Sequence, residues 1–201
     1  MAGRYQLKLR AERQEETRQR IVAAAVALHT SVGPLHTTDS AIAERAGITR
    51  VTFYRHFPTD VALFQACTSH GLACWPLPDS AAWAHIADPA ARLGTALREL
   101  YAYYAIAGDG LVVLLRDLPL MRAELRVSPN RTEVLRAMVP GLARGWGARG
   151  RRVSVGRASI EHALSVFTWQ SLVRHGGLDD DEAVDALVAL VERAYGRPCS
   201  G

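Results

Sequence analysis

The sequence predicts an all-α protein, and three observations carry this prediction. Apolar residues recur at helical spacing in several separate segments, and no alternation typical of β-strands persists in any of them. Capping residues and glycine or proline stops bound these segments. The chain has 201 residues, of which 49% are hydrophobic and 22% charged, a balance that supports a substantial core. We therefore expect a folded protein built from helices alone.

The first third of the chain predicts four helices. Residues 1–14 are polar and basic and are expected to form a flexible arm. The first helix then runs from about Glu15 to the stop at Gly33 and Pro34. Good N-cap residues precede the next three helices, at Thr38, Thr49 and Thr59. Gly47 is expected to end the second helix with a positive φ. Two short helices joined by a glycine-containing turn predict a helix-turn-helix, so residues 15–74 are expected to form this module with a connecting fourth helix.

The remainder predicts a second, larger helical domain over residues 75–201. Residues 75–90 are rich in Pro, Ala and Asp and are the expected joint. Helices are predicted over 90–107, 130–145, 157–174 and 182–195, with a short apolar segment at 111–118 and a Gly/Arg-rich loop at 145–156. The acidic run at 179–181 is expected to cap the last helix rather than to bind calcium.

Charge and cysteine content narrow the classes of function. The net charge is +4, and residues 1–60 hold nine Lys/Arg against six Asp/Glu, which is compatible with a nucleic-acid partner. The three cysteines form no CxxC pair, so a disulfide framework or zinc ribbon is not expected. Cys67 and Cys74 are either core thiols or a redox-sensing pair. Without an apolar signal segment or an 18-residue apolar stretch, we expect a cytoplasmic protein with no membrane partner.

The stretch 37–58 contains the most informative pattern. Its apolar members predict a small core of Ile42, Ala43, Ala46, Ile48, Phe53 and Phe57. Its polar members are then left to face outward, and they are Thr49, Arg50, Thr52, Tyr54 and His56. Hydroxyls and tyrosine can bond phosphates or base edges, and arginine can take the O6 and N7 of guanine. This face is therefore expected to bind DNA.

These residues resemble the tetracycline-repressor (TetR) family of transcriptional regulators from about Thr17 to Phe64. The resemblance is carried by Ile21-Val22-Ala23-Ala24-Ala25, Gly33 with Thr37-Thr38, Ile42-Ala43-Glu44-Arg45-Ala46-Gly47, and Tyr54-Arg55-His56-Phe57-Pro58. It implies that residues 50–56 form a recognition helix in the major groove. The implied DNA-binding positions are Thr38, Thr49, Arg50, Thr52, Tyr54 and His56, the last two on phosphates.

Three residues depart from the family pattern. His29 stands where the family usually has Phe, so packing on the first helix is expected to differ. Val51 replaces a common Gly and joins the expected DNA-binding residues, since its methyl groups can meet a thymine methyl. Asp60 replaces a frequent Lys. We expect this change to weaken nonspecific DNA affinity, because it removes a cation from the phosphate backbone.

The resemblance also implies a homodimer, a palindromic operator and a small-molecule effector bound by the larger domain. The expected dimer contacts lie on the last two helices and are Ile160, Leu164, Phe167, Leu172, Val184, Leu187, Val188 and Val191, with packing inside one subunit as the alternative. Aromatic, soft and polar residues suggest a pocket for a largely apolar ligand: Tyr101, Tyr104, Met121, Met138, Trp146, His162, Phe167 and Trp169. The same residues can equally be plain core.

No cofactor and no metal site are expected, since the seven histidines form no HxxxH or HExxH pattern. The basic residues at 149–152 suit a solvated loop better than a nucleic-acid contact, and the arm at 1–14 either reaches the minor groove or makes no contact. We expect a ligand-responsive repressor. The alternatives are a regulator that binds DNA without a ligand, or an enzyme with a vestigial helix-turn-helix, for which no catalytic constellation is visible.

Overall fold

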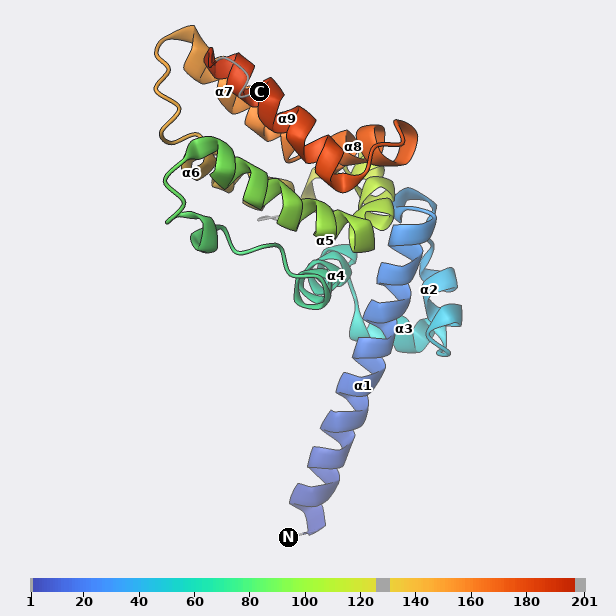
Figure 1. The fold of residues 1–201 in the computed structure, drawn as a ribbon. Helices are drawn as coiled ribbons and strands as arrows, with labels where there is room; N and C mark the ends of the chain where they lie inside the picture. The colour runs from blue at the N-terminus through green and yellow to red at the C-terminus, as the bar shows by residue number, and fades with distance from the viewer. Residues whose placement is uncertain (1, 126–130, 198–201) are drawn as a thin grey trace. The chain divides into compact units, whose positions relative to one another are not determined.

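The computed structural model describes residues 2–125 and 131–197, which form helices and their connections and no strand (Figure 1). The all-α prediction is confirmed. The described residues divide into two compact units. One comprises the residues up to Pro76 together with Val113 to Leu125, and the other comprises Leu77–Val112 and the residues from Arg131 onward. The expected joint at 75–90 therefore begins where the first unit ends.

The first unit contains the predicted helix-turn-helix. Its elements are α1 (Ala2–Ser31), η1 (Pro34–His36), α2 (Asp39–Arg45), α3 (Arg50–His56), α4 (Asp60–Cys74), η3 (Leu118–Leu120) and η4 (Ala123–Leu125). The side chains of α1, α2, α3 and α4 share one core that includes Ile21, Ile42, Phe53 and Leu63. Gly33 ends the run after α1 with φ +97°, a conformation that glycine adopts without strain.

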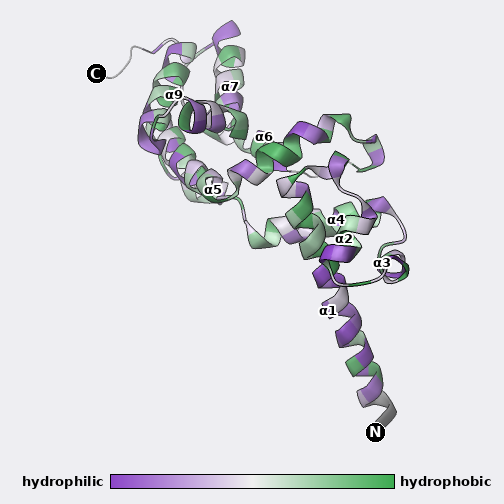
Figure 2. Ribbon diagram, turned by 90° about the vertical axis from the view of Figure 1, so that its right-hand side faces the viewer, coloured by the Kyte–Doolittle hydropathy of each residue, from purple (hydrophilic) through white to green (hydrophobic). Residues whose placement is uncertain are grey.

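Helix α1 is longer than predicted, because residues 2–14 continue it instead of forming a flexible arm. Strong helix formers such as Leu7, Leu9 and Ala11 fill this stretch, and Lys8 pairs with Glu12 one turn later at 3.8 Å. Figures 1 and 2 show this end of α1 running beyond α2, α3 and α4, with mostly hydrophilic residues along it. Its exposed side chains explain why hydrophobic periodicity did not reveal it.

A short segment after α5 completes the first unit. Asp117 has only 2% of its surface exposed, and its carboxylate accepts a hydrogen bond from the backbone N–H of Leu35 at 3.3 Å. The adjacent Arg116 donates to the same carboxylate at 2.8 Å and holds the pKa of Asp117 below its ordinary value. The first unit thus includes residues more than 80 positions apart in the chain.

The second unit is a bundle of helices. Its elements are η2 (Ser80–Trp83), α5 (Pro89–Asp117, up to Val112), α6 (Arg131–Leu142), α7 (Arg151–Ala163), α8 (Val166–Trp169), the π-helical η5 (Gln170–His175) and α9 (Asp180–Tyr195). Helix α5 passes without a break through the end predicted at residue 107. Gly108 lies inside this helix. A larger residue would not fit there, because a Cβ would come within 2.5 Å of the Trp169 ring.

Two boundaries in the second unit differ from the prediction. Helix α7 begins at Arg151, inside the expected loop, after Gly150 takes φ +59°. The single helix expected over 157–174 is interrupted after Leu164, and the hydroxyl of Ser165 accepts the backbone N–H of Phe167 at the start of α8. A serine inside an apolar run competes for backbone hydrogen bonds in this way.

Helix α9 begins with the acidic cap that the sequence predicted. Asp179 accepts the backbone N–H of Glu182 at 2.8 Å, and the Glu182 side chain accepts the backbone N–H of Asp179 at 3.0 Å, which is a capping box. Helix α9 packs on α7, where Gly156 lies directly against the Tyr195 ring. Arg98 of α5 donates to Asp181 and Asp185 of α9 at 3.0 and 3.3 Å.

Cysteines and histidines make no metal-binding group of three or more within residues 2–125 and 131–197. Cys67 is a buried core thiol, whereas Cys74 is exposed and lies 3.4 Å from a ring nitrogen of His70. Cys199 lies outside the described residues. None of the helices in the described parts of the chain combines the length and the apolar character that a membrane span needs.

Candidate nucleic-acid interface

Helices α2 and α3 are started by threonine side chains. Thr38 accepts the backbone N–H of Ala41, and Thr49 accepts the backbone N–H of Thr52, each at 3.2 Å. Gly47 between the helices has φ +65°, as expected for the residue that ends α2. The next residue returns to α2, since the backbone N–H of Ile48 bonds the carbonyl of Ala43 at 3.0 Å. Local hydrogen bonds therefore set the angle between the two helices.

The core of this helix pair matches the prediction. Ile42, Ala43, Ala46, Phe53 and Phe57 are all buried, and Ile48 is half-buried. Phe53 and Phe57 contact each other with ring centroids 6.3 Å apart. Because these residues point inward, the opposite face of α3 is left at the surface.

That face carries the residues predicted to bind DNA. Thr49, Arg50, Val51 and Tyr54 are exposed, Val51 most of all at 79%. Thr52 and His56 are half-buried, and Thr38 is exposed at the start of α2. The hydroxyls of Thr49 and Thr52 lie 3.1 Å apart, so one of them donates to the other in the free protein.

Arg50, Tyr54 and Asp39 form a polar network across α2 and α3. Tyr54 donates its hydroxyl proton to the Asp39 carboxylate at 2.9 Å, and Arg50 donates to the Tyr54 oxygen at 3.2 Å. The hydrogen bond to Tyr54, followed by charge attraction, raises the pKa of Arg50. Sequence reasoning missed Asp39. An acidic residue in the first turn of a helix is already explained by its interaction with the helix dipole. The sequence therefore gave no sign that Asp39 has a partner 15 residues away.

His56, at the end of α3, is held toward its neutral form. Its pKa is lowered first by desolvation and then by the cations Arg55 and Arg18. A neutral imidazole can still donate one N–H to a phosphate oxygen. The Arg18 guanidinium lies 4.4 Å above the Phe57 ring, so this cation is anchored beside the same edge of the unit.

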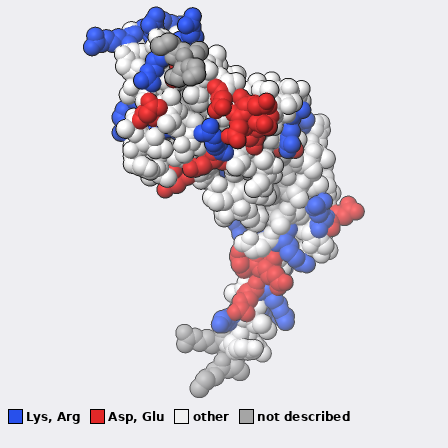
Figure 3. All heavy atoms as spheres, viewed as in Figure 1, with Lys and Arg blue, Asp and Glu red and all other residues white. Residues whose placement is uncertain are grey.

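The projecting part of α1 mixes the two signs of charge. Exposed basic residues such as Lys8 and Arg13 alternate with exposed Glu12, Glu15 and Glu16. Figure 3 shows red and blue side by side along this helix. The positive charge that a phosphate backbone needs is therefore concentrated on α3, which carries Arg50 and Arg55 and no acidic residue, rather than on α1.

His29, one of the departures from the family pattern, is buried with 5% of its surface exposed. Its ring stacks on Phe64 with centroids 5.0 Å apart and an interplanar angle of 9°. Burial lowers the pKa of His29 to about 4. The histidine thus replaces an aromatic packing residue by another flat ring that carries two nitrogens.

Asp60, a further departure, is engaged in an ion pair. Its carboxylate accepts a hydrogen bond from the guanidinium of Arg122 at 2.8 Å, and both side chains are more than half exposed. Arg122 also lies 3.6 Å from Glu124. The acid at the start of α4 therefore attracts a cation from the 118–125 segment within the same unit.

The residues suggested as a ligand pocket differ in burial and in the unit to which they belong. Tyr101, Tyr104 and Trp169 are fully buried and in ring contact, and the two tyrosine hydroxyls donate to the carbonyls of Ala163 and Leu164. The others are dispersed. Trp146 stacks on Tyr195, Met138 is half-buried, His162 and Phe167 are exposed, and Met121 belongs to the first unit. The ligand pocket therefore stays a prediction for these residues.

Most residues expected at the dimer interface are used inside the subunit. Ile160 of α7 and Leu164 directly after this helix, with Val184, Leu187 and Val191 of α9, are 4% exposed or less, and α7 and α9 pack on each other. For these five the packing lies inside the subunit, which is the alternative that the sequence left open, and the dimer interface stays a prediction. Phe167 is exposed and Leu172 and Val188 are half-buried, so only these three retain surface. The outer face of the pair instead presents Val155 and Leu190, at 41% and 50% exposure.

The profile of the family described as "Bacterial regulatory proteins, tetR family" matches residues 21–67, from α1 into α4. No curated protein sequence matches the chain. A putative fatty acid metabolism regulator of Clostridium perfringens has a similar structure, with a TM-score of 0.61 and 17% identity over 87% of this chain and 97% of its own. The structure of AibR in complex with isovaleryl coenzyme A and operator DNA is also similar, with a TM-score of 0.60 and 17% sequence identity over 87% of this chain and 97% of AibR. A third similar structure is that of NalD from Pseudomonas aeruginosa, the secondary repressor of the MexAB-OprM multidrug efflux pump. Its TM-score is 0.57, with 22% sequence identity over 91% of this chain and 97% of NalD. At these identities the likeness is one of fold.

Proposed function

Residues 21–67 place this chain among the bacterial regulatory proteins of the tetR family, and on that premise we propose that it is a homodimeric repressor that binds operator DNA and releases it when a small, largely apolar molecule binds. The exposed face of α3 is the observation that carries the proposal. Thr49, Arg50, Val51 and Tyr54 stand on one short, well-capped helix whose opposite face is core. Such a helix fits the major groove of DNA.

In the proposed complex the residues divide by role. Arg50 and Val51 read base edges, through guanine acceptors and a thymine methyl respectively. Thr38, Thr49, Thr52, Tyr54 and His56 bond phosphates or nearby base edges and fix the register on the duplex. Phosphate neutralisation makes the affinity fall with salt. The protein then works in the cytoplasm, where bacterial DNA is found.

DNA binding has to exchange the hydrogen bonds of the free surface for new ones. Tyr54 gives its proton to Asp39 in the free protein, and the same proton is the one a phosphate oxygen would accept. Arg50 likewise leaves the Tyr54 oxygen when it turns to a base. Asp39 therefore holds both side chains in place before DNA arrives and stands as an anion beside the phosphates afterwards.

A homodimer follows from the need for two recognition helices about 34–36 Å apart on a palindromic operator. The exposed faces of α7 and α9 are proposed as the contact, with Val155, Phe167 and Leu190 as its apolar members. Small residues between them, Ser154 and Ala158, permit close approach of a partner helix. Sedimentation velocity of the purified protein measures its oligomeric state directly. The substitution Leu190→Asp should shift the protein from dimer to monomer.

Release by a ligand is supported by two of the similar structures. AibR was solved with isovaleryl coenzyme A as well as operator DNA, and NalD is described as a repressor. In this chain the effector would contact the half-buried or exposed members of the suggested pocket set in the second unit, namely Met138, His162 and Phe167. A regulator that binds DNA without any ligand is the second candidate, and an enzyme has no supporting constellation on the described surface.

The experiment that tests the proposal is a mobility shift with DNA from the region upstream of the protein's own gene. We expect a specific shift that competitor DNA does not remove, and the absence of a specific shift at any salt concentration would contradict the repressor. Thermal-shift screening then separates the two candidates. A compound that raises the melting temperature and also releases DNA supports ligand response, whereas stabilising compounds that leave DNA bound support the constitutive regulator.

A further inference from the structure

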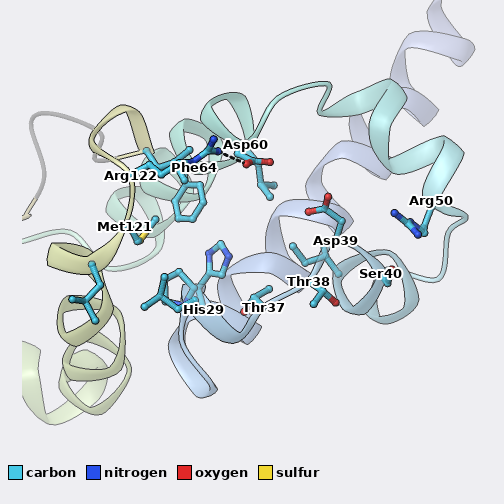
Figure 4. A pocket seen from close by; sticks show the side chains of 16 residues that line it. His29, Thr37, Thr38, Asp39, Ser40, Arg50, Asp60, Phe64, Met121 and Arg122 are labelled. Carbon is cyan, nitrogen blue, oxygen red and sulfur yellow. Dashed lines mark hydrogen bonds and ion pairs between the residues drawn. The ribbon is translucent and has the colours of Figure 1, made fainter.

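The first unit contains a cavity that the DNA-binding surface does not use in full. It has a volume of about 520 Å³ and is lined only by residues of this unit. His29 of α1, Phe64 of α4 and Met121 of the 118–125 segment lie at one end beside the Arg122–Asp60 ion pair, and Thr38, Asp39 and Arg50 lie toward the other end (Figure 4). This volume lies within the range of small-molecule sites.

His29 is the feature of this cavity that the packing alone does not explain. One face of its ring is covered by Phe64, yet among the described residues nothing forms a hydrogen bond with its nitrogens. Its pKa of about 4 keeps the ring neutral at pH 7, with one nitrogen as donor and the other as acceptor. The nitrogens of His29 are not among the fully enclosed polar atoms without a partner, and the residue lines the cavity, so a ligand hydroxyl in the cavity can exchange a hydrogen bond with one of them.

The charges around the cavity nearly cancel. Arg122 is paired with Asp60 at 2.8 Å, and Arg50 is tied through the Tyr54 hydroxyl to Asp39. Each cation thus already has an anion nearby, so no net field in the cavity attracts either an anion or a cation. Leucines, Phe64 and Met121 contribute apolar surface instead.

We propose that this cavity binds a small, uncharged aromatic alcohol, whose ring lies between Phe64 and Met121 and whose hydroxyl bonds to a nitrogen of His29. The site belongs to the DNA-binding unit itself and is separate from an effector site in the second unit. Thr38, Asp39 and Arg50 line the opposite end of the same cavity, which connects the proposed site to α2 and α3. Only an effect on DNA binding rests on the proposed function; the binding site does not.

The test uses 2-naphthol as the probe, with the whole chain and no DNA present. Binding is followed by isothermal titration and by the ¹H–¹³C signals of the seven histidines. We expect saturable binding and movement of the His29 imidazole signal, while the signal of His70, half-buried on α4 outside the cavity, stays in place. Naphthalene tests the hydroxyl and should bind about three- to tenfold more weakly, as the loss of one hydrogen bond predicts. The anion 2-naphthoate tests the charge and should also bind more weakly, because its carboxylate loses hydration while Arg122 and Arg50 are already engaged.

Two variants and one matched control locate the probe. His29→Phe keeps the stacked ring but removes the nitrogens, and it should weaken 2-naphthol by about three- to tenfold. Leu35→Trp places a larger ring on a partly exposed wall and should abolish binding, which keeps the test informative if His29→Phe folds poorly. His70→Phe makes the same chemical change outside the cavity and should bind like the natural protein.

Binding that is lost in His29→Phe and Leu35→Trp but kept in His70→Phe supports the site. The proposal is overturned if no saturable binding is seen, if both cavity variants bind as the natural chain does, or if 2-naphthoate binds as tightly as 2-naphthol. None of these readouts involves DNA. A failed mobility shift with intact 2-naphthol binding would therefore refute the proposed repressor and leave the site standing.

Discussion

His29 should make the stability of the first unit depend on pH. Its pKa is about 4 in the folded chain because the ring is buried against Phe64, whereas an unfolded histidine titrates near 6.5. As the pH falls below 6.5, the unfolded chain takes up the proton first, so protonation favours unfolding. The stability is fully present above pH 6.5 and is lost progressively down to about pH 4.

The magnitude follows from the gap between the two pKa values. A difference of one pKa unit corresponds to about 1.4 kcal/mol for one proton. The free energy of unfolding should therefore fall by about 2 kcal/mol at pH 5 and about 3 kcal/mol at pH 4, relative to its value at about pH 7. His29→Phe removes this contribution and keeps the stacked ring on Phe64. The variant should therefore match or exceed the natural protein at pH 7 and lose less stability on acidification.

Urea unfolding followed by circular dichroism at pH 7, 6, 5 and 4.5 measures the difference. His70→Phe is the control, since it removes a histidine from the same unit without touching the buried ring. The difference between the natural chain and His29→Phe should grow by about 1.4 kcal/mol for each unit below pH 6.5. Parallel curves for these two proteins, or an equal effect in His70→Phe, would refute the reasoning.

Three further results are expected. Gly156→Ala should lower the free energy of unfolding by about 1–3 kcal/mol in urea titrations, because its Cβ would meet the Tyr195 ring at 2.3 Å, whereas Gly141→Ala, with no atom within 4 Å, should raise it by up to about 1 kcal/mol; equal effects would contradict the α7–α9 packing. Tyr54→Phe should weaken operator binding by about three- to tenfold in fluorescence anisotropy, and tighter binding would show that Asp39 merely sequesters the hydroxyl. Asp60→Lys should tighten DNA binding and steepen its dependence on salt relative to Asp60→Asn, so identical salt slopes would remove residue 60 from the interface.

The local structure of the helix-turn-helix could be predicted from the sequence. Thr38 and Thr49 cap α2 and α3 through backbone groups three residues ahead, and Asp179 with Glu182 does the same for α9. Gly47 turns the chain with a positive φ that other residues rarely adopt. Such features depend on neighbours within one turn, so their residue types and spacing were sufficient.

Contacts between distant segments were decided only by the tertiary structure. Asp39 meets Tyr54 across two helices, and Gly108 and Gly156 are explained by the rings of Trp169 and Tyr195, which lie far along the chain. The apolar stripe of α9 predicted a buried face correctly but not its partner. The stripe packs on α7 of the same subunit, because periodicity reports which side of a helix avoids water and not which surface covers it.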